Sequence, residues 1–149
     1  MCEGFPRIRT RNRRHHHFSI GYGLDFTGAD LSGLDLLGAE FSGAILTRVP
    51  LVGVDLYTAW LAGAQLSEAD LGCADLRKAQ ARGCHARHAK LRGAQLQRAD
   101  FSESDLLGAD LNGARLQRTS FYGADLRAGR PPRLYLRENM VRGYTSCGL

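Results

Sequence analysis

Ala64-Gln65-Leu66-Ser67-Glu68 is one of 21 five-residue blocks that follow one another without interruption from Leu24 to Ala128. The third residue of each block, here called the centre, is Leu in fifteen blocks, Phe in four and Ala in two. The residue two places before the centre is Ala in fourteen blocks, and Gly closes eleven. Self-similarity at a fixed short period indicates a repeat architecture, in which neighbouring units stabilise one another.

A five-residue period fits neither an α-helix nor a flat strand. On a helix, steps of five advance about 140° beyond a full turn and spread the centres over all sides. On a flat strand, an odd spacing sends successive centres to opposite faces. The small residue and the centre of one block share a side if the chain is extended, so the other three residues must turn it. A closing Gly suits a corner with positive φ, and the chain therefore winds around its own leucines.

These blocks resemble the A(D/N)LXX motif of the pentapeptide-repeat proteins over 105 of the 149 residues. The resemblance implies an all-β fold, a right-handed quadrilateral β-solenoid with four blocks per turn. The centres and the small residues would point inward, and the other three residues of each block outward. Twenty-one blocks then make about five coils, and a strand spacing of about 4.8 Å gives a rod roughly 25 Å long.

Three segments are expected along the chain. The solenoid takes residues 24–128, between a basic N-terminal arm and cap at residues 1–23 and a C-terminal cap or tail at residues 129–149. Repeat rods need caps because an open end exposes the core and unpaired strand edges. The family resemblance also implies a homodimer through the C-terminal end.

Four blocks per turn place residues 20 positions apart over one another, which predicts the columns of the core. One column consists of leucines only: Leu31, Leu51, Leu71, Leu91 and Leu111. Each buried large side chain stabilises the fold by about 2 kcal/mol. Ala81 and Ala86 are the two small centres, and we expect the weakest packing in their coil.

The net charge of +5 hides a segregation along the chain. Residues 24–75 sum to −7, whereas residues 76–98 contain no acid and sum to +7. Two acidic faces are expected, with Asp35, Asp55 and Asp75 on one and Asp30 and Asp70 on the face before it. Four arginines follow their centres at steps of five and are expected to form a belt around one coil: Arg77, Arg82, Arg87 and Arg92.

Each charged feature has a structural and a functional interpretation. An Asp before the centre can support the corner by accepting backbone N–H groups, whereas a stacked acidic column could imitate a phosphate backbone. The resemblance then implies a DNA mimic that binds type II topoisomerase (DNA gyrase) and confers quinolone or toxin resistance. The belt meets a flat surface with only one or two charges, which favours a solvated ring over nucleic-acid binding. The basic arm, from Arg7 to Arg14, is the better candidate for phosphate contacts and gives a third function.

Trp60 stands at an outward position that Asp usually holds, with Ile45 and Tyr57 also outward nearby. Exposed aromatic side chains on a rigid surface are typical binding anchors. These three residues are therefore the candidate protein-binding site, and coverage by the N-terminal segment is the open alternative.

Catalytic and metal-binding patterns are missing from the sequence. Cys84 is expected to point inward and His85 and His88 outward, so these possible ligands do not converge. No phosphate-binding loop or nucleophile elbow occurs, so we expect no enzyme and no cofactor. The cysteines lack CxxC spacing and the apolar stretches are short, which indicates reduced thiols, no membrane segment and a cytoplasmic protein. The leading interpretation is a non-catalytic rod that binds a protein partner.

Overall fold

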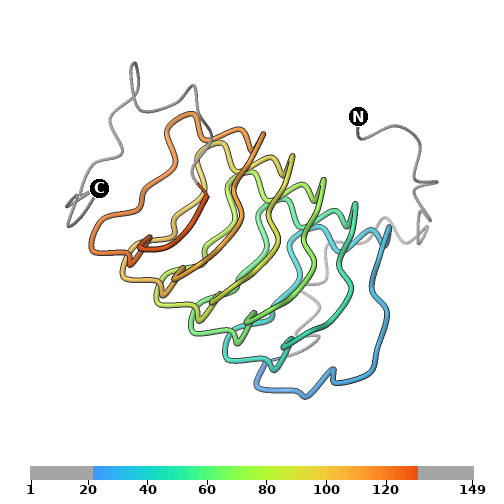
Figure 1. Ribbon diagram of the computed structural model, residues 1–149. Helices are drawn as coiled ribbons and strands as arrows, with labels where there is room; N and C mark the ends of the chain where they lie inside the picture. Colours follow the sequence, from blue (N-terminus) through green and yellow to red (C-terminus); the bar gives the residue numbers. More distant parts are fainter. Residues whose placement is uncertain (1–21, 131–149) are drawn as a thin grey trace.

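Parallel bridges between residues 20 positions apart organise this computed structural model, which describes residues 22–130. Asp55, for example, bridges to Asp35 in one turn and to Asp75 in the next. Each bridge involves a single residue, and within the described range the chain contains no helix and no extended strand. The turns stack from the N-terminal coil to the C-terminal coil as a β-solenoid (Figure 1). The expected stacking of residues 20 apart is confirmed by these bridges.

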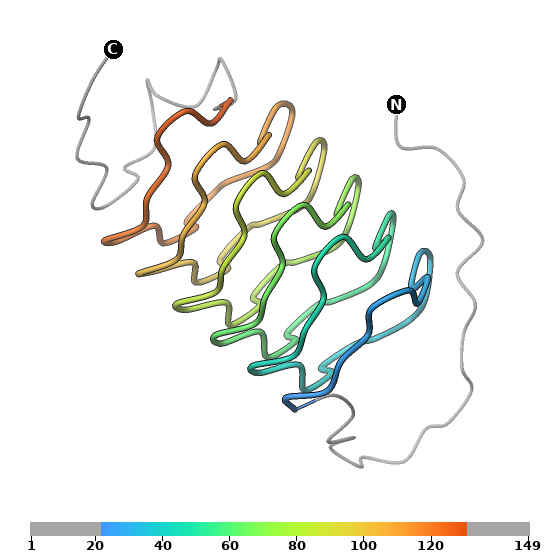
Figure 2. The ribbon, with the colours of Figure 1, turned by 60° about the horizontal axis from the view of Figure 1, so that its bottom comes forward.

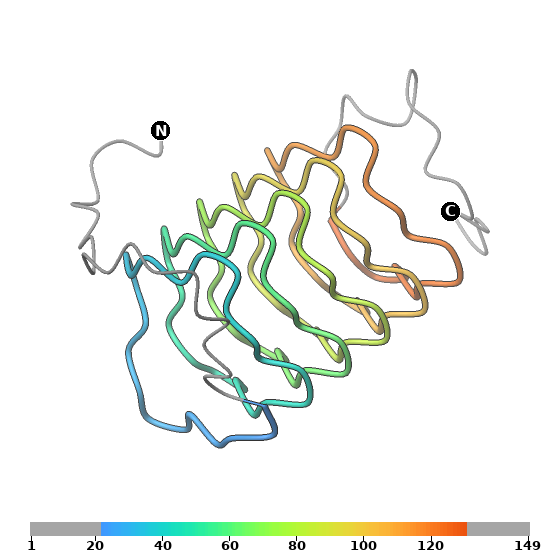
Figure 3. The same ribbon diagram turned by 180° about the vertical axis from the view of Figure 1, so that it is seen from behind.

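The bridged residues form four columns, and each column marks one side of the coil (Figures 2 and 3). Side A carries Asp25, Ile45, Gln65, His85, Asp105 and Asp125; side B carries Pro50, Asp70, Lys90, Asp110 and Arg130. Side C carries Asp35, Asp55, Asp75, Gln95 and Arg115; side D carries Glu40, Trp60, Gln80, Asp100 and Ser120. Asp30 precedes Pro50 on side B, where the N–H of Leu31 donates to the Pro50 carbonyl at 2.9 Å.

Backbone hydrogen bonds run from each turn to the turns on both sides of it. The N–H of Leu66 donates to the carbonyl of His85 in the following turn at 2.7 Å. The N–H of Gln65 donates to the carbonyl of Ala44 in the preceding turn at 2.9 Å. Because buried backbone groups must be paired, these bonds hold successive coils in register.

Every corner is a β-turn that starts at a centre. The N–H of Ala69 donates to the carbonyl of Leu66 at 3.0 Å, and the same bond recurs along the solenoid. The third turn residue has positive φ, as in a type II turn. All eleven closing glycines of the blocks have positive φ, which confirms the expectation for the corners. Ten other block ends also have φ between 53° and 62°, so the coil imposes this conformation on residues with a side chain.

The core is formed by the two inward positions of the blocks, except at Leu24 in the first block, which is 54% exposed. Leu51, Leu71 and Leu91 are each 1% exposed and Leu111 is 3% exposed, whereas Leu31 is only partly buried. Leu31 belongs to the first coil, which has no described coil before it. Aromatic centres stack along the column of side D, where the rings of Phe101 and Phe121 lie 5.9 Å apart.

The coil of small centres is closed to solvent, since Ala81 and Ala86 are at most 1% exposed. Two buried hydroxyl groups of later coils, those of Ser104 and Thr119, are paired. Ser104 donates to the carbonyl of Ala81 at 2.8 Å, and Thr119 donates to the carbonyl of Leu96 at 2.7 Å. These bonds remove the cost of burying a hydroxyl group.

The two cysteines of the described coils differ. Cys84 carries a free thiol inside the core, and burial raises its pKa to about 11. Cys73 is disulfide-bonded, so the expectation that it is a reduced thiol was wrong.

Both ends of the chain lie outside the described residues. Apart from a few flanking positions, the expected N-terminal arm and cap fall on residues 1–21. The expected C-terminal cap or tail, with its dimer contact, falls on residues 131–149. Among residues 22–130, no helix is long and apolar enough to cross a bilayer.

Candidate interaction surfaces

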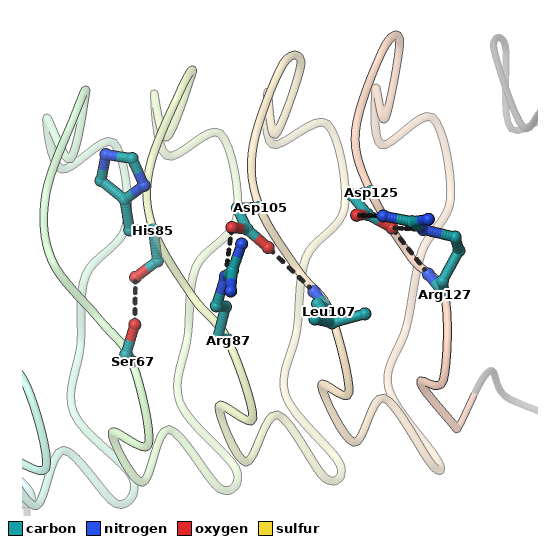
Figure 4. Close-up of polar contacts among 7 residues, drawn as sticks. All are labelled: Ser67, His85, Arg87, Asp105, Leu107, Asp125 and Arg127. Atoms are coloured by element: carbon teal, nitrogen blue, oxygen red, sulfur yellow. Dashed lines mark hydrogen bonds and ion pairs between the residues drawn. The ribbon is translucent and has the colours of Figure 1, made fainter.

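The acid before the centre supports the corner that follows it. Oδ1 of Asp55 accepts the N–H of Tyr57 at 3.0 Å, and Oδ1 of Asp105 accepts that of Leu107 at 3.3 Å (Figure 4). All eleven acids at this position make this bond to the residue two places on. The N–H and hydroxyl of Ser32 lower the pKa of Asp30 in this way. The structural interpretation of these acids is therefore confirmed.

The acidic column on side C is present but short. Asp35, Asp55 and Asp75 are bridged in succession, as the 20-residue spacing predicted. Asp75 is 5% exposed, and its Oδ2 lies 2.5 Å from Nη2 of Arg77. Gln95 and Arg115 then continue the column, so its second half carries no acid.

The other acidic face, on side B, is interrupted by a base. Asp30 is exposed at its start. Oδ2 of Asp70 lies 3.3 Å from Nζ of Lys90, the next residue of the column. Neither acidic face therefore presents an uninterrupted row of free carboxylates along the described coils.

The four belt arginines lie on four different sides, and each has a carboxylate partner. Arg77 pairs with Asp75 in its own block. The other three reach the following coil, where Arg82 meets Glu103 at 2.6 Å, Arg87 meets Asp105 at 2.5 Å and Arg92 meets Asp110 at 3.9 Å. Figure 4 shows Arg87 and Asp105 side by side on side A. The belt is thus compensated by acids, whereas a ring exposed only to water was expected.

The three residues of the candidate protein-binding site are not gathered on one side. Trp60 lies on side D and Ile45 on side A, while Tyr57 follows Asp55 on side C. Trp60 is 49% exposed, whereas Ile45 and Tyr57 are partly buried. The Tyr57 ring also has Arg77 and Lys78 over it, at 5.3 and 5.2 Å from its centroid. Trp60 alone remains a well-exposed anchor of the three.

On side D, several small residues lie near Trp60, which was not expected from the sequence. Five residues beside and around it in its own and neighbouring turns are small: Ser42, Gly43, Ala62, Gly63 and Gly83. A Cβ atom added at Gly43, Gly63 or Gly83 would meet nothing within 4 Å, so no side chain covers these corners. The 20-residue spacing could have found this set. We call these five residues with Trp60 the Trp60 surface.

A second surface was also missed. Lys78, Arg98 and Arg118 close successive blocks of side C, and Arg115 lies in the bridge column beside them. All four are exposed. We call them the basic strip.

The possible metal ligands do not come together. Cys84 is fully buried, while His85 and His88 are exposed. Within the described coils, no group of three or more His, Cys, Asp or Glu side chains is arranged to hold a metal ion.

Comparisons with known proteins identify the repeat. The family model described as "Pentapeptide repeats (8 copies)" matches residues 25–61, 59–97 and 94–128, which is more than half of the chain. A comparison with curated proteins found no match.

Solved structures of pentapeptide repeat proteins are also similar. HetL from the cyanobacterium Nostoc sp. PCC 7120, involved in heterocyst differentiation regulation, is 26% identical, with 68% of each chain covered and a TM-score of 0.45. A pentapeptide repeat protein of the Arabidopsis thaliana thylakoid lumen is 30% identical, with 72% of this chain and 68% of that one covered and a TM-score of 0.20. QnrB1, a plasmid-mediated fluoroquinolone resistance protein, is 23% identical, with 64% and 62% covered and a TM-score of 0.47. The repeats matched over residues 25–128 place the chain in the pentapeptide-repeat family.

Proposed function

We propose that this protein is a non-catalytic, rigid rod that binds a protein partner through its outer surface. The inward positions are filled by core residues, and backbone bonds join each turn to the next. Outward side chains that make no hydrogen bond to a corner can therefore change without altering the coil. Pentapeptide-repeat proteins are in general non-catalytic structural or binding proteins, which agrees with this role.

The Trp60 surface is the observation that carries the proposal. Trp60 takes a position that an acid holds in eleven blocks, and it is half exposed. The uncovered corners at Gly43, Gly63 and Gly83 leave room for a partner beside the indole, whose bridged neighbours in the adjoining turns are Glu40 and Gln80. Large aromatic residues at such places are typical energetic centres of protein interfaces.

A pull-down with the tagged full-length chain tests this proposal. We expect a partner that the wild type retains to be lost with Trp60→Ala and with Ala62→Glu, which places a charge beside the indole. Tyr122→Ala is the matched control, because Tyr122 is 65% exposed and follows Ser120 on the same side, further along the rod. Partners that bind all four proteins equally would refute the Trp60 surface as the binding site.

A DNA mimic that acts on gyrase is the alternative, favoured by the stacked Asp35, Asp55 and Asp75. The pairing of Asp75 with Arg77 and the change to Gln95 leave two free carboxylates in that column. Such a short row is a poor imitation of a backbone with a charge about every 1.7 Å of duplex. We expect gyrase supercoiling to be indifferent to the purified protein. Inhibition that disappears with Asp35→Asn and Asp55→Asn would establish the alternative instead.

The third function, nucleic-acid binding through the arm from Arg7 to Arg14, concerns residues outside the described coils. The proposal also includes a cytoplasmic location and, from the family resemblance, right-handed winding in about five coils. A crystal structure tests the winding, and a fluorescent fusion tests the location.

A further inference from the structure

The basic strip runs along the rod, whereas the belt runs around it. The N–H of Lys78 donates to the carbonyl of Gln97 at 3.1 Å, and the N–H of Arg98 donates to that of Gln117 at 3.0 Å. These bonds place Lys78, Arg98 and Arg118 over one another in three successive coils. Neighbouring strands are about 4.8 Å apart, so the three residues form a closely spaced row on one side, in which the Lys78 ammonium lies over the Tyr57 ring.

No acid compensates this row. Within residues 22–130, no carboxylate lies in ion-pairing distance of the four strip residues, although all four belt arginines have such a partner. The neighbouring acid of the column, Asp75, is already paired with Arg77. Two coils of the strip, at residues 95–98 and 115–118, have further outward residues on side C. These are all amides: Gln95, Gln97 and Gln117.

The backbone does not explain why cations stand in the strip. Lys78, Arg98 and Arg118 have φ of 60–62°, a conformation that Gly adopts without strain. Gly holds the equivalent position in most blocks of sides B and D. The strip therefore has charged side chains at corners where the backbone conformation favours glycine.

From this arrangement we propose that the basic strip binds the phosphate backbone of a nucleic acid. A linear polyanion laid along side C meets four uncompensated cations at once, which a belt around the coil does not allow. The amides of Gln95 and Gln117 supply both donors and acceptors next to the row, which suits contacts to sugars and base edges. This surface is separate from the Trp60 surface on side D, so it adds a function to the proposed one.

The composition of the strip favours a nucleic acid over an acidic protein. Protein interfaces depend on buried aromatic or apolar anchors, and none of the outward residues of these two coils on side C is apolar. Contacts with phosphates depend mainly on charge and on polar groups.

Fluorescence anisotropy with the full-length chain tests the proposal. The probes are a labelled 20-nucleotide single-stranded DNA of mixed sequence, the same sequence as RNA, and the DNA duplex. Four phosphates neutralised on a single strand give a slope of roughly −2.8 for log K against log salt, which is about a 50-fold loss of affinity from 50 to 200 mM salt. The variant with Lys78→Gln, Arg98→Gln, Arg115→Gln and Arg118→Gln should lose this binding while it keeps the wild-type melting temperature.

Two controls distinguish binding by the strip from binding by the N-terminal arm and from attraction to any acidic polymer. A variant with Arg7→Gln, Arg9→Gln, Arg11→Gln and Arg13→Gln removes the same charge from the arm. We expect it to retain most of the affinity and the salt slope. Equal binding by the wild type and the strip variant, with loss only in the arm variant, would overturn the proposal. Equal affinity for a polyglutamate of matched charge would also overturn it, in favour of an acidic protein partner.

Discussion

Leu71 offers a direct test of how the solenoid is stabilised. It is 1% exposed and lies between Leu51 and Leu91 in the core column of side B. Its backbone bonds, from its N–H to the Lys90 carbonyl and from the Ala74 N–H to its own carbonyl, do not depend on the side chain. Leu71→Ala therefore leaves the coil intact and opens a cavity at its axis.

The expected cost follows from the burial. Removing a fully buried leucine side chain costs about 3–5 kcal/mol, because the lost transfer energy is increased by the cavity. For a chain of this length, that is a fall of roughly 10–16 °C in melting temperature. Leu37→Ala is the matched control, since Leu37 is 61% exposed at an outward position of the neighbouring side. The Leu37→Ala variant should lose less than about 1 kcal/mol of unfolding free energy.

Urea and thermal unfolding followed by circular dichroism measure both variants. Equal losses of unfolding free energy in Leu71→Ala and Leu37→Ala would refute the assignment of inward and outward positions in the blocks. A loss below about 1 kcal/mol for Leu71→Ala would show that its side chain does not lie in a close-packed core.

Three further changes have defined outcomes. Ala81→Leu should raise the melting temperature by the equivalent of about 1 kcal/mol, because Ala81 is a small centre in a column of larger ones; a fall would mean that neighbouring rings fill the space. Hydrogen bonds from Arg127 lower the pKa of Asp125 from 3.8 to about 2. A carboxyl with a depressed folded pKa stabilises the fold above its ordinary pKa, and this contribution is lost as the pH falls. The wild type should therefore lose more stability than Asp125→Asn between about pH 3.8 and pH 2, in melting curves recorded across that range. With its pKa raised to about 11, the buried Cys84 should react with iodoacetamide at pH 8 only after unfolding in urea; mass spectrometry that finds native labelling would contradict the burial.

The candidate sites were predictable where the spacing of 20 residues decides them. That spacing correctly stacked Asp35, Asp55 and Asp75, and it would also have found the basic strip. Ile45, Tyr57 and Trp60 are close in sequence, but each step of five moves to another side of the coil. Nearness along the chain was therefore a poor guide to nearness on the surface.

The ion pairs of the belt could not be predicted in the same way. Arg82 and Glu103 are 21 positions apart, and Arg87 and Asp105 are 18 apart. Neither spacing is the period of the coil. Such pairs form because long side chains bend across to the next coil, and their rotamers depend on the neighbours present there.

The sequence by itself determined the architecture, because the repeat sets the same local choice in every block. The small residue and the centre must point inward to bury their apolar surface, and the block end must turn. Only the tertiary structure decided which outer charges are compensated, that block ends with a side chain also adopt positive φ, and which glycine corners near Trp60 stay uncovered. The ion pairs and the uncovered corners depend on contacts between coils, where long outward side chains meet residues 18 to 21 positions away that no local pattern specifies.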